Sequence, residues 1–523
     1  MSSVEDNNNI SIKELITINQ DKINDILNHR YTDESLLFGT IIFTQSKVQS
    51  YILTEFESQV KSKFIDTNND NATGISNNLQ DLNSKYLTPG NIVDKVWIAI
   101  HHPTIKYFQS QFYYLDKESR KLTNGNNNSN INGNGINSNN NTNNNSNNNI
   151  NNNHNSNNNR RNDKTLNYKS VEFRKLFDSY VKFISKCYSF YFNVIHSLIN
   201  KYNLSIYIPI KKICSTLKFE LSKDVIKNLI DLPPATITDN DSHISNNNNS
   251  NTDTRNEVVS EIIYTIHKCI LFIGDLSRYR TLIAKTYLPL NSISKEDNNN
   301  YSKSIELYKL SLLVLPSLGD PYNHIAIIDN LKDDKFNVVY NFMRSCLTTK
   351  PSIIGFNNLI NFLSKDPLIN PIFKQFEKLN CLNRDKITKN DRLELLKTEF
   401  LILLNYYLLP NKWKLKEGYL FKNYKIKDIQ NDFLLLLSKL DFHKQIFNDF
   451  YLKQLSILLG GFELLIDNNK NHPDLIQDKL IISNYLKFIM KYFMNMMKTS
   501  INNNKLNIDS SSSQSSDNNN NNK

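Results

Sequence analysis

The stretch that decides the fold is residues 257–280, which read EVVSEIIYTIHKCILFIGDLSRYR. Its apolar residues recur every three or four positions, the spacing that places them on one stripe of an α-helix. They are Val258, Ile262, Ile266, Cys269, Ile270, Ile273 and Leu276. The pattern predicts a packed helix at the centre of a helical bundle. Because a glycine inside a helix costs about 1 kcal/mol relative to alanine, we expect a neighbouring helix to approach closely at Gly274.

Directly after Gly274 the same helix carries the side chains of a candidate anion site. Asp275 lies one turn before Arg278, so its carboxylate can hold the guanidinium while the remaining donors point into a cleft. Tyr279 adds a hydroxyl beside them. This arrangement predicts a phosphate pocket. The alternative is an ordinary ion pair on an amphipathic helix.

Four segments of the sequence carry a resemblance to a known family. They are GDLSRYR at 274–280, GDPYNHIA at 319–326, YNFMRS at 340–345 and the Val96-Trp97 pair with the helix after it. In this order they resemble the Est1 and SMG family, which comprises telomerase regulatory subunits and adaptors of nonsense-mediated mRNA decay. The resemblance implies an all-α fold, a 14-3-3-like helical domain with tetratricopeptide-type hairpins followed by a second helical region.

The same resemblance implies roles for individual residues. In the family, as in 14-3-3 proteins with their similar Gly-Asp-x-x-Arg-Tyr run, the arginine at the place of Arg278 contacts a phosphoserine. The family's second phosphate ligand is a basic residue on the tryptophan-bearing helix, where an ungapped match places His102, with Lys106 one turn later. The predicted phosphopeptide site is therefore Arg278, Tyr279, His102 and Lys106. Since a histidine is mostly neutral at pH 7, this pocket is weaker than one with two permanent cations.

Composition limits the class of protein. The 523 residues carry a formal net charge of +11, which favours polyanionic partners, nucleic acid first. Five cysteines without a Cys-x-x-Cys pair are expected to be reduced core thiols, and no metal or cofactor is expected. The longest apolar runs fall short of the roughly 18 residues of a membrane span, so we expect a soluble protein of the nucleus or cytoplasm without membrane contact.

Asparagine tracts divide the chain. They have nothing to bury and cannot offset their ordering entropy, so they are expected to be disordered. Helical periodicity on either side of the tracts, with helix pairs of tetratricopeptide type around 301–363, completes the organisation. The predicted parts are N-terminal helices of the 14-3-3-like domain at 1–122, a disordered insert at 123–163, the tetratricopeptide and 14-3-3-like core at 164–365 with a disordered insert at 239–256, a C-terminal helical region at 366–500, and a disordered tail at 501–523.

A second candidate site lies in the C-terminal region, where lysines alternate with aromatic residues between 411 and 427. Lysines neutralise phosphates and aromatic rings stack on unpaired bases, so this mixture suits a single-stranded nucleic acid. The alternative is a solvated loop whose lysines only keep the protein soluble. The predicted nucleic-acid-binding residues are Lys412, Trp413, Lys414, Lys416, Lys422, Tyr424, Lys425 and Lys427.

Catalysis finds no support in the sequence, which has no phosphate-binding glycine loop, zinc-protease motif or nucleophile elbow. Some family members end in a nuclease domain built on acidic residues, whereas this chain ends in Asn and Ser, so we expect no such activity. An enzyme therefore remains a minor third possibility beside the two functions within the family.

The function we expect is a non-catalytic telomerase regulatory subunit that serves telomere maintenance in the nucleus. Its expected partners are telomerase RNA and the catalytic subunit, telomeric single-stranded DNA or the protein that binds it, and a phosphoprotein. The alternative is an mRNA decay adaptor that binds a phosphorylated helicase through Arg278, with the cytoplasm as an additional location. The substitution of histidine at 102 argues mildly against this alternative.

Overall fold

The computed structural model forms two compact units, Met1–Leu315 and Pro316–Lys523, each with its own hydrophobic core. Each unit is described separately. The described residues are 11–28, 33–62, 88–125, 170–232, 250–289, 293–294, 301–364, 366–382, 387–409, 424–439, 445–466 and 479–514.

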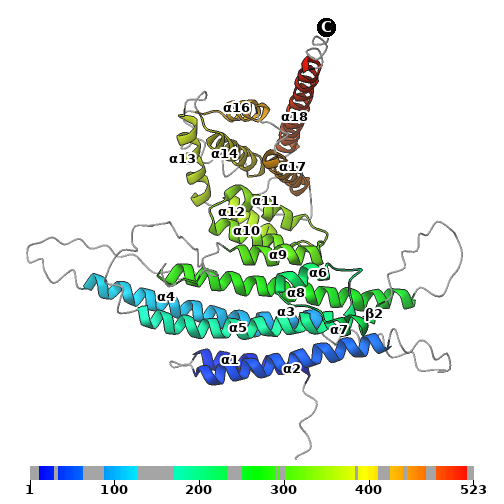
Figure 1. Ribbon diagram of the computed structural model, residues 1–523. Helices are drawn as coiled ribbons and strands as arrows, with labels where there is room; N and C mark the ends of the chain where they lie inside the picture. The colour runs from blue at the N-terminus through cyan, green and yellow to red at the C-terminus, as the bar shows by residue number, and fades with distance from the viewer. Residues whose placement is uncertain are drawn as a thin grey trace, which may run out of the picture. The chain divides into compact units, whose positions relative to one another are not determined.

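The first unit is a stack of long helices (Figure 1). Helix α1 pairs with α2, α2 packs on α5, α5 packs on α8, and α8 packs on α9. The helices of this unit are α1 (Ile12–Asn28), α2 (Glu34–Val60), α3 (Pro89–Val96), α4 (His102–Gly125), α5 (Ser170–Lys201), α6 (Ile210–Leu217), α7 (Lys223–Lys227), α8 (Ser250–Tyr287) and α9 (Ser302–Val314).

The helix predicted from residues 257–280 is α8, and it lies between α5 and α9 as a central element of its unit. Every residue of the predicted apolar stripe is buried, which confirms the predicted helix. The helix begins at Ser250, so residues 250–256, which the sequence places in a disordered insert, are helical. No proline or glycine in that segment breaks the helix, and α-helix hydrogen bonds can therefore continue through it.

Two local features of the first unit depart from a simple α-helical pattern. Between α3 and α4 the chain forms one π-helical stretch, Trp97–His101, so the predicted tryptophan helix is a continuous rod with a widened turn. Two very short strands, β1 (Tyr202–Asn203) and β2 (Ile230–Asp231), pair in parallel. The predicted all-α class still holds, because this pair is the only sheet within the part of the chain that the structure describes.

The second unit begins at Pro316 and consists of helices packed mainly on their neighbours along the chain. Helix α10 packs on α11, and α11 on both α12 and α17. The helices of this unit are α10 (Asp320–Leu331), α11 (Lys335–Cys346), α12 (Gly355–Ser364), α13 (Asp366–Asn380), α14 (Lys389–Leu408), α16 (Ile426–Ser438), α17 (Gln445–Ile466) and α18 (Lys479–Gln514).

The ends of these units differ from the predicted domain limits. The compact units divide between Leu315 and Pro316, inside the range 164–365 that the sequence predicts as one core. Helix α18 continues to Gln514, so residues 501–514 of the predicted disordered tail are helical. Asparagine and serine are poor helix formers but do not end a helix as proline does. The inserts at 126–163 and 239–249 lie outside the described residues.

Candidate ligand-binding sites

Arg278 lies in a cluster of buried polar side chains on α8 and α9. Its Nη2 donates to Oδ1 of Asp275 at 2.9 Å, and its Nε donates to the Tyr308 hydroxyl at 3.2 Å. The Tyr308 hydroxyl in turn donates to the same Asp275 oxygen at 2.7 Å. Only 7% of Arg278 is exposed. The predicted pairing of Asp275 with Arg278 is therefore present, and it is tighter and more deeply buried than the sequence suggested.

Gly274 permits this cluster to form. A Cβ atom at position 274 would lie 2.6 Å from a ring carbon of Tyr308, closer than packed atoms come. The close approach predicted for Gly274 is thus confirmed, and the approaching group is the ring of Tyr308 on α9. Any larger residue would push α9 away and separate the Tyr308 hydroxyl from Asp275.

The ring of Tyr279 covers the guanidinium from another side. The Cζ atom of Arg278 lies 4.2 Å from the centroid of the Tyr279 ring, a cation–π arrangement. The His102 ring of α4 lies 6.3 Å from the Tyr279 ring. The structure therefore brings Arg278, Tyr279 and His102 together, although they come from two helices far apart in sequence.

The electrostatics around this cluster are positive. Burial lowers the pKa of His102, and Lys106 and Arg278 lower it further, while Asp275 opposes them. Burial and then the Arg278 charge also lower the pKa of Lys106, which is exposed one turn along α4. Neighbouring cations that lower one another's pKa values would have their charged forms stabilised by a bound anion. Within the described part of the chain, Nη1 of Arg278 makes no hydrogen bond.

His101, the neighbour of His102, belongs to the core instead. Its ring is fully buried, with Nδ1 2.7 Å from the Tyr191 hydroxyl and Nε2 2.9 Å from the Gln45 amide. Burial lowers its pKa to about 3, so it stays neutral. Trp97 also packs, stacking on Phe272 at a centroid distance of 4.6 Å. Both side chains position the helix that carries His102.

The second predicted site falls largely outside the described residues, which end at 409 and resume at 424. Lys412, Trp413, Lys414, Lys416 and Lys422 lie in that gap. Tyr424 is described and packs against Phe376, with ring centroids 5.1 Å apart, so it contributes to the core of its unit. Lys425 and Lys427 are exposed at the start of α16. Their role in binding nucleic acid stays a prediction.

The hydrogen bonds of Tyr308 are a part of the site that sequence reasoning missed. Tyr308 lies 33 residues from Asp275, so no local spacing connects the two. The glycine at 274 was the one signal, because it required a large neighbouring group. Nothing in the sequence indicated that this group would carry a hydroxyl.

No group of three or more His, Cys, Asp or Glu side chains within the described residues could hold a metal ion. No helix among them is long and apolar enough to cross a membrane. The cysteines differ in burial: Cys187, Cys269 and Cys346 are buried, whereas Cys214 is half-buried and Cys381 is exposed, and all are free thiols.

Comparison with known families decides what kind of scaffold this is. The family model described as telomerase activating protein Est1 matches residues 91–284, which include the π-helical stretch, Asp275 and Arg278. The model described as the Est1 DNA/RNA binding domain matches residues 304–521. The chain belongs to the Est1 and SMG family.

Two curated relatives come from Saccharomyces cerevisiae. Nonsense-mediated mRNA decay factor EBS1 is 25% identical over 492 residues, 91% of this chain and 46% of that protein. Telomere elongation protein EST1 is 25% identical over 228 residues, 42% of this chain and 30% of that protein. The chain thus spans less than half the length of either relative.

A solved structure supports the fold of this family member. The crystal structure of Est1 and Cdc13 matches with a TM-score of 0.57 and 17% identity, covering 93% of this chain and 71% of that chain. The predicted class, an all-α 14-3-3-like fold with tetratricopeptide-type hairpins, is confirmed by this likeness. At this level of identity the likeness concerns the fold alone.

Proposed function

We propose that this protein is a non-catalytic regulatory and recruitment subunit of telomerase, active at chromosome ends in the nucleus. It binds telomerase RNA or telomeric single-stranded DNA and contacts the catalytic subunit or the protein that covers the single strand. The observation that carries this proposal is the pair of Est1 family models, which match residues 91–284 and 304–521. A polyanionic partner also agrees with the net charge of +11.

The nucleic acid is proposed to bind the second unit, where the DNA/RNA binding model matches. Lys425 and Lys427 are exposed at the start of α16, beside the segment that contains Lys412, Trp413 and Lys422. A lysine on a phosphate releases counterions, so such contacts weaken steeply with salt. A triple Lys422→Glu, Lys425→Glu, Lys427→Glu variant should bind single-stranded nucleic acid more weakly and with a flatter salt dependence.

The control for this variant carries the same change in net charge elsewhere. Lys211, Lys223 and Lys227 are exposed in the first unit, and their replacement by glutamate should leave the salt slope almost unchanged. If wild type and the 422/425/427 variant show the same salt dependence of binding, these lysines only lie in a solvated loop and do not contact the nucleic acid.

A phosphorylated peptide is the proposed ligand of the Arg278 cluster. Arg278 is held in place by Asp275 and Tyr308 before any ligand arrives, and pre-positioned donors lose less entropy on binding. Lys106 and His102 lie beside it, and burial first and then neighbouring cations lower the pKa of both. A phosphate there would accept hydrogen bonds from the arginine and the Tyr279 hydroxyl, and would raise the pKa of His102 and so recruit its charge.

A second candidate function is that of an adaptor in nonsense-mediated mRNA decay that binds a phosphorylated helicase. The match to EBS1, named as a decay factor, extends over 91% of this chain and favours this candidate. The same phosphate site would serve it.

One experiment separates the two functions. The tagged full chain is immunoprecipitated from crosslinked cells, and the recovered RNA is sequenced. Enrichment of telomerase RNA over total RNA supports the telomerase function. Enrichment of aberrant messages together with a phosphorylated helicase, without telomerase RNA, contradicts it and supports the decay function.

A further inference from the structure

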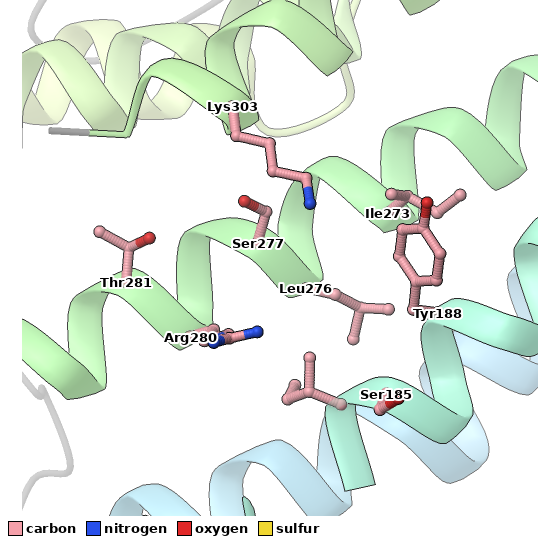
Figure 2. A pocket seen from close by; sticks show the side chains of 9 residues that line it. Ser185, Tyr188, Ile273, Leu276, Ser277, Arg280, Thr281 and Lys303 are labelled. Atoms are coloured by element: carbon pink, nitrogen blue, oxygen red, sulfur yellow. The ribbon is translucent and has the colours of Figure 1, made fainter. Parts of the chain in front are cut away.

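A cavity of about 200 Å³ lies between α5, α8 and α9 (Figure 2). Ser277, Arg280 and Thr281 line it from α8. Each residue turns an α-helix by about 100°, so Ser277 and Arg280 point away from Arg278. Neither Asp275, Arg278 nor Tyr308 is among the residues that line the cavity. The cavity is therefore separate from the Arg278 cluster, and neither the family match nor the sequence patterns assign it a ligand.

The charged side chains of this cavity are all positive. Figure 2 shows Lys303 reaching from α9 and Arg280 from α8 into the space beside Tyr188 of α5. The Lys303 ammonium lies 5.7 Å from the centroid of the Tyr188 ring and forms no ion pair with any described residue. The lining contains no carboxylate. Two cations without a lining acid favour an anionic ligand.

Hydroxyl groups complete the lining. Thr281 is only 3% exposed, yet its hydroxyl makes no hydrogen bond within the described part of the chain. The hydroxyls of Ser277 and Tyr188 also have no partner among the residues that the structure places. Ser277 and Tyr188 are half-buried, so their hydroxyls are open to solvent, and a ligand rich in acceptor oxygens could accept from the three hydroxyls together.

The start of α9 adds to the positive field. Its N-cap residue, Tyr301, has left-handed backbone geometry with φ 66° and supplies no side-chain hydrogen bond to the helix amides. The first turn carries Lys303 and no acidic residue. A lysine at the positive end of a helix dipole is unfavourable by itself, and a bound anion would offset this.

We propose that this cavity binds the phosphate group of a phosphorylated side chain on a partner protein. Two cations and three hydroxyl donors suit a phosphate monoester better than a carboxylate, because the phosphate carries more charge and more acceptor oxygens. The cavity has room for a single group, whereas a nucleic-acid backbone needs an extended track of cations and stacking surfaces. The proposal is independent of the nucleic-acid partner and of the Arg278 cluster.

The test uses the full chain with labelled isoleucine methyl groups, since Ile184 and Ile273 line the cavity. N-acetyl-phosphoserine amide is titrated while the methyl resonances of these two residues are followed by NMR. Saturable shifts are expected, tighter than those with inorganic phosphate and absent with the unphosphorylated compound. Because Lys303 supplies a charge-assisted contact, Lys303→Gln should weaken binding about tenfold.

Thr281→Val, which removes only the buried hydroxyl, should also weaken binding. The matched control is Lys309→Gln on the exposed side of the same helix, which should leave the affinity unchanged. Shifts that do not saturate, or equal affinities for the 303 and 309 variants, would overturn the proposal. So would tighter binding of inorganic phosphate, or shifts produced by a short single-stranded oligonucleotide and not by the phosphoserine compound.

Discussion

The Tyr308 hydroxyl donates a 2.7 Å hydrogen bond to Oδ1 of Asp275, joining α9 to α8 at the position of Arg278. The same carboxylate oxygen accepts from Arg278, so one atom organises both partners. Burial would disfavour the arginine charge, but Tyr308 and Asp275 raise the pKa of Arg278 well above its usual value. The arginine is therefore fixed in position and permanently charged before any ligand arrives.

Removal of the Tyr308 hydroxyl should destabilise the first unit. Tyr308→Phe removes the hydroxyl that accepts from Nε of Arg278 and donates to Asp275, so two buried hydrogen bonds are lost while the bonds from Arg278 to Asp275 remain. This loss should lower the free energy of unfolding by about 1 to 3 kcal/mol. Urea denaturation measures this change. Tyr113→Phe is the control, because Tyr113 is exposed on α4. Loss of its hydroxyl should change the free energy of unfolding by less than about 0.5 kcal/mol. Equal effects of the two substitutions would contradict the role given to Tyr308.

Two glycines in helices should respond to alanine with opposite signs. At Gly274 a Cβ would meet the Tyr308 ring at 2.6 Å, so Gly274→Ala should destabilise by about 1 to 3 kcal/mol despite the better helix propensity of alanine. At Gly39 of α2 a Cβ meets nothing within 4 Å, so Gly39→Ala should stabilise by about 0.5 to 1 kcal/mol. Thermal unfolding of both variants checks this. Two stabilising substitutions would mean that α9 does not lie tightly against α8.

Stability should fall in mild acid because of His101. Its pKa is lowered to about 3 by burial, so the unfolded chain takes up a proton near pH 6.5 that the folded chain cannot bind. Below that pH the free energy of unfolding should drop by up to about 1.4 kcal/mol per pH unit from this group alone. His101→Asn, which cannot be protonated, should lose less stability than wild type between about pH 7.5 and pH 5.5. Parallel pH curves would show that His101 is not buried in its neutral form.

The exposed lysine of the Arg278 cluster offers a clean binding test. Lys106→Gln removes one cation without disturbing the core, and should weaken a phosphoserine peptide about tenfold through loss of a charge-assisted contact. Lys117→Gln on the same helix is the matched control, because Lys117 is exposed and outside the cluster. Fluorescence anisotropy with a labelled peptide gives both affinities. If the 106 variant binds the peptide with unchanged affinity, Lys106 does not belong to the binding site.

Much of the fold was predictable because helical periodicity reports burial directly. The stripe from Val258 to Leu276 is buried as the spacing requires, and the pair Asp275 and Arg278 is local to one helix. The helix ends were harder. The asparagine-rich composition indicated disorder at 250–256 and 501–514, but these residues are helical parts of α8 and α18. The prediction was wrong because composition does not show how far a helix that forms in the neighbouring sequence will extend.

The candidate site was predictable only within one helix. The hydrogen bonds of Tyr308 depend on the axial position of α9 relative to α8. The spacing of residues in the sequence contains no information on that position. Likewise, the cavity lined by Arg280 and Lys303 lies between three helices. Of these two residues, only Arg280 lies in the GDLSRYR segment. Contacts between helices therefore account for most of what sequence reasoning missed.

The central claim, a telomerase subunit in the Est1 and SMG family, is tested most directly by telomere length after deletion of the gene. Telomeric restriction fragments are measured over successive generations of the deleted strain, alongside the half-life of a message with a premature stop codon. The account predicts progressive shortening that the wild-type gene reverses, with the message decaying normally. Constant telomere length together with a stabilised message would contradict it.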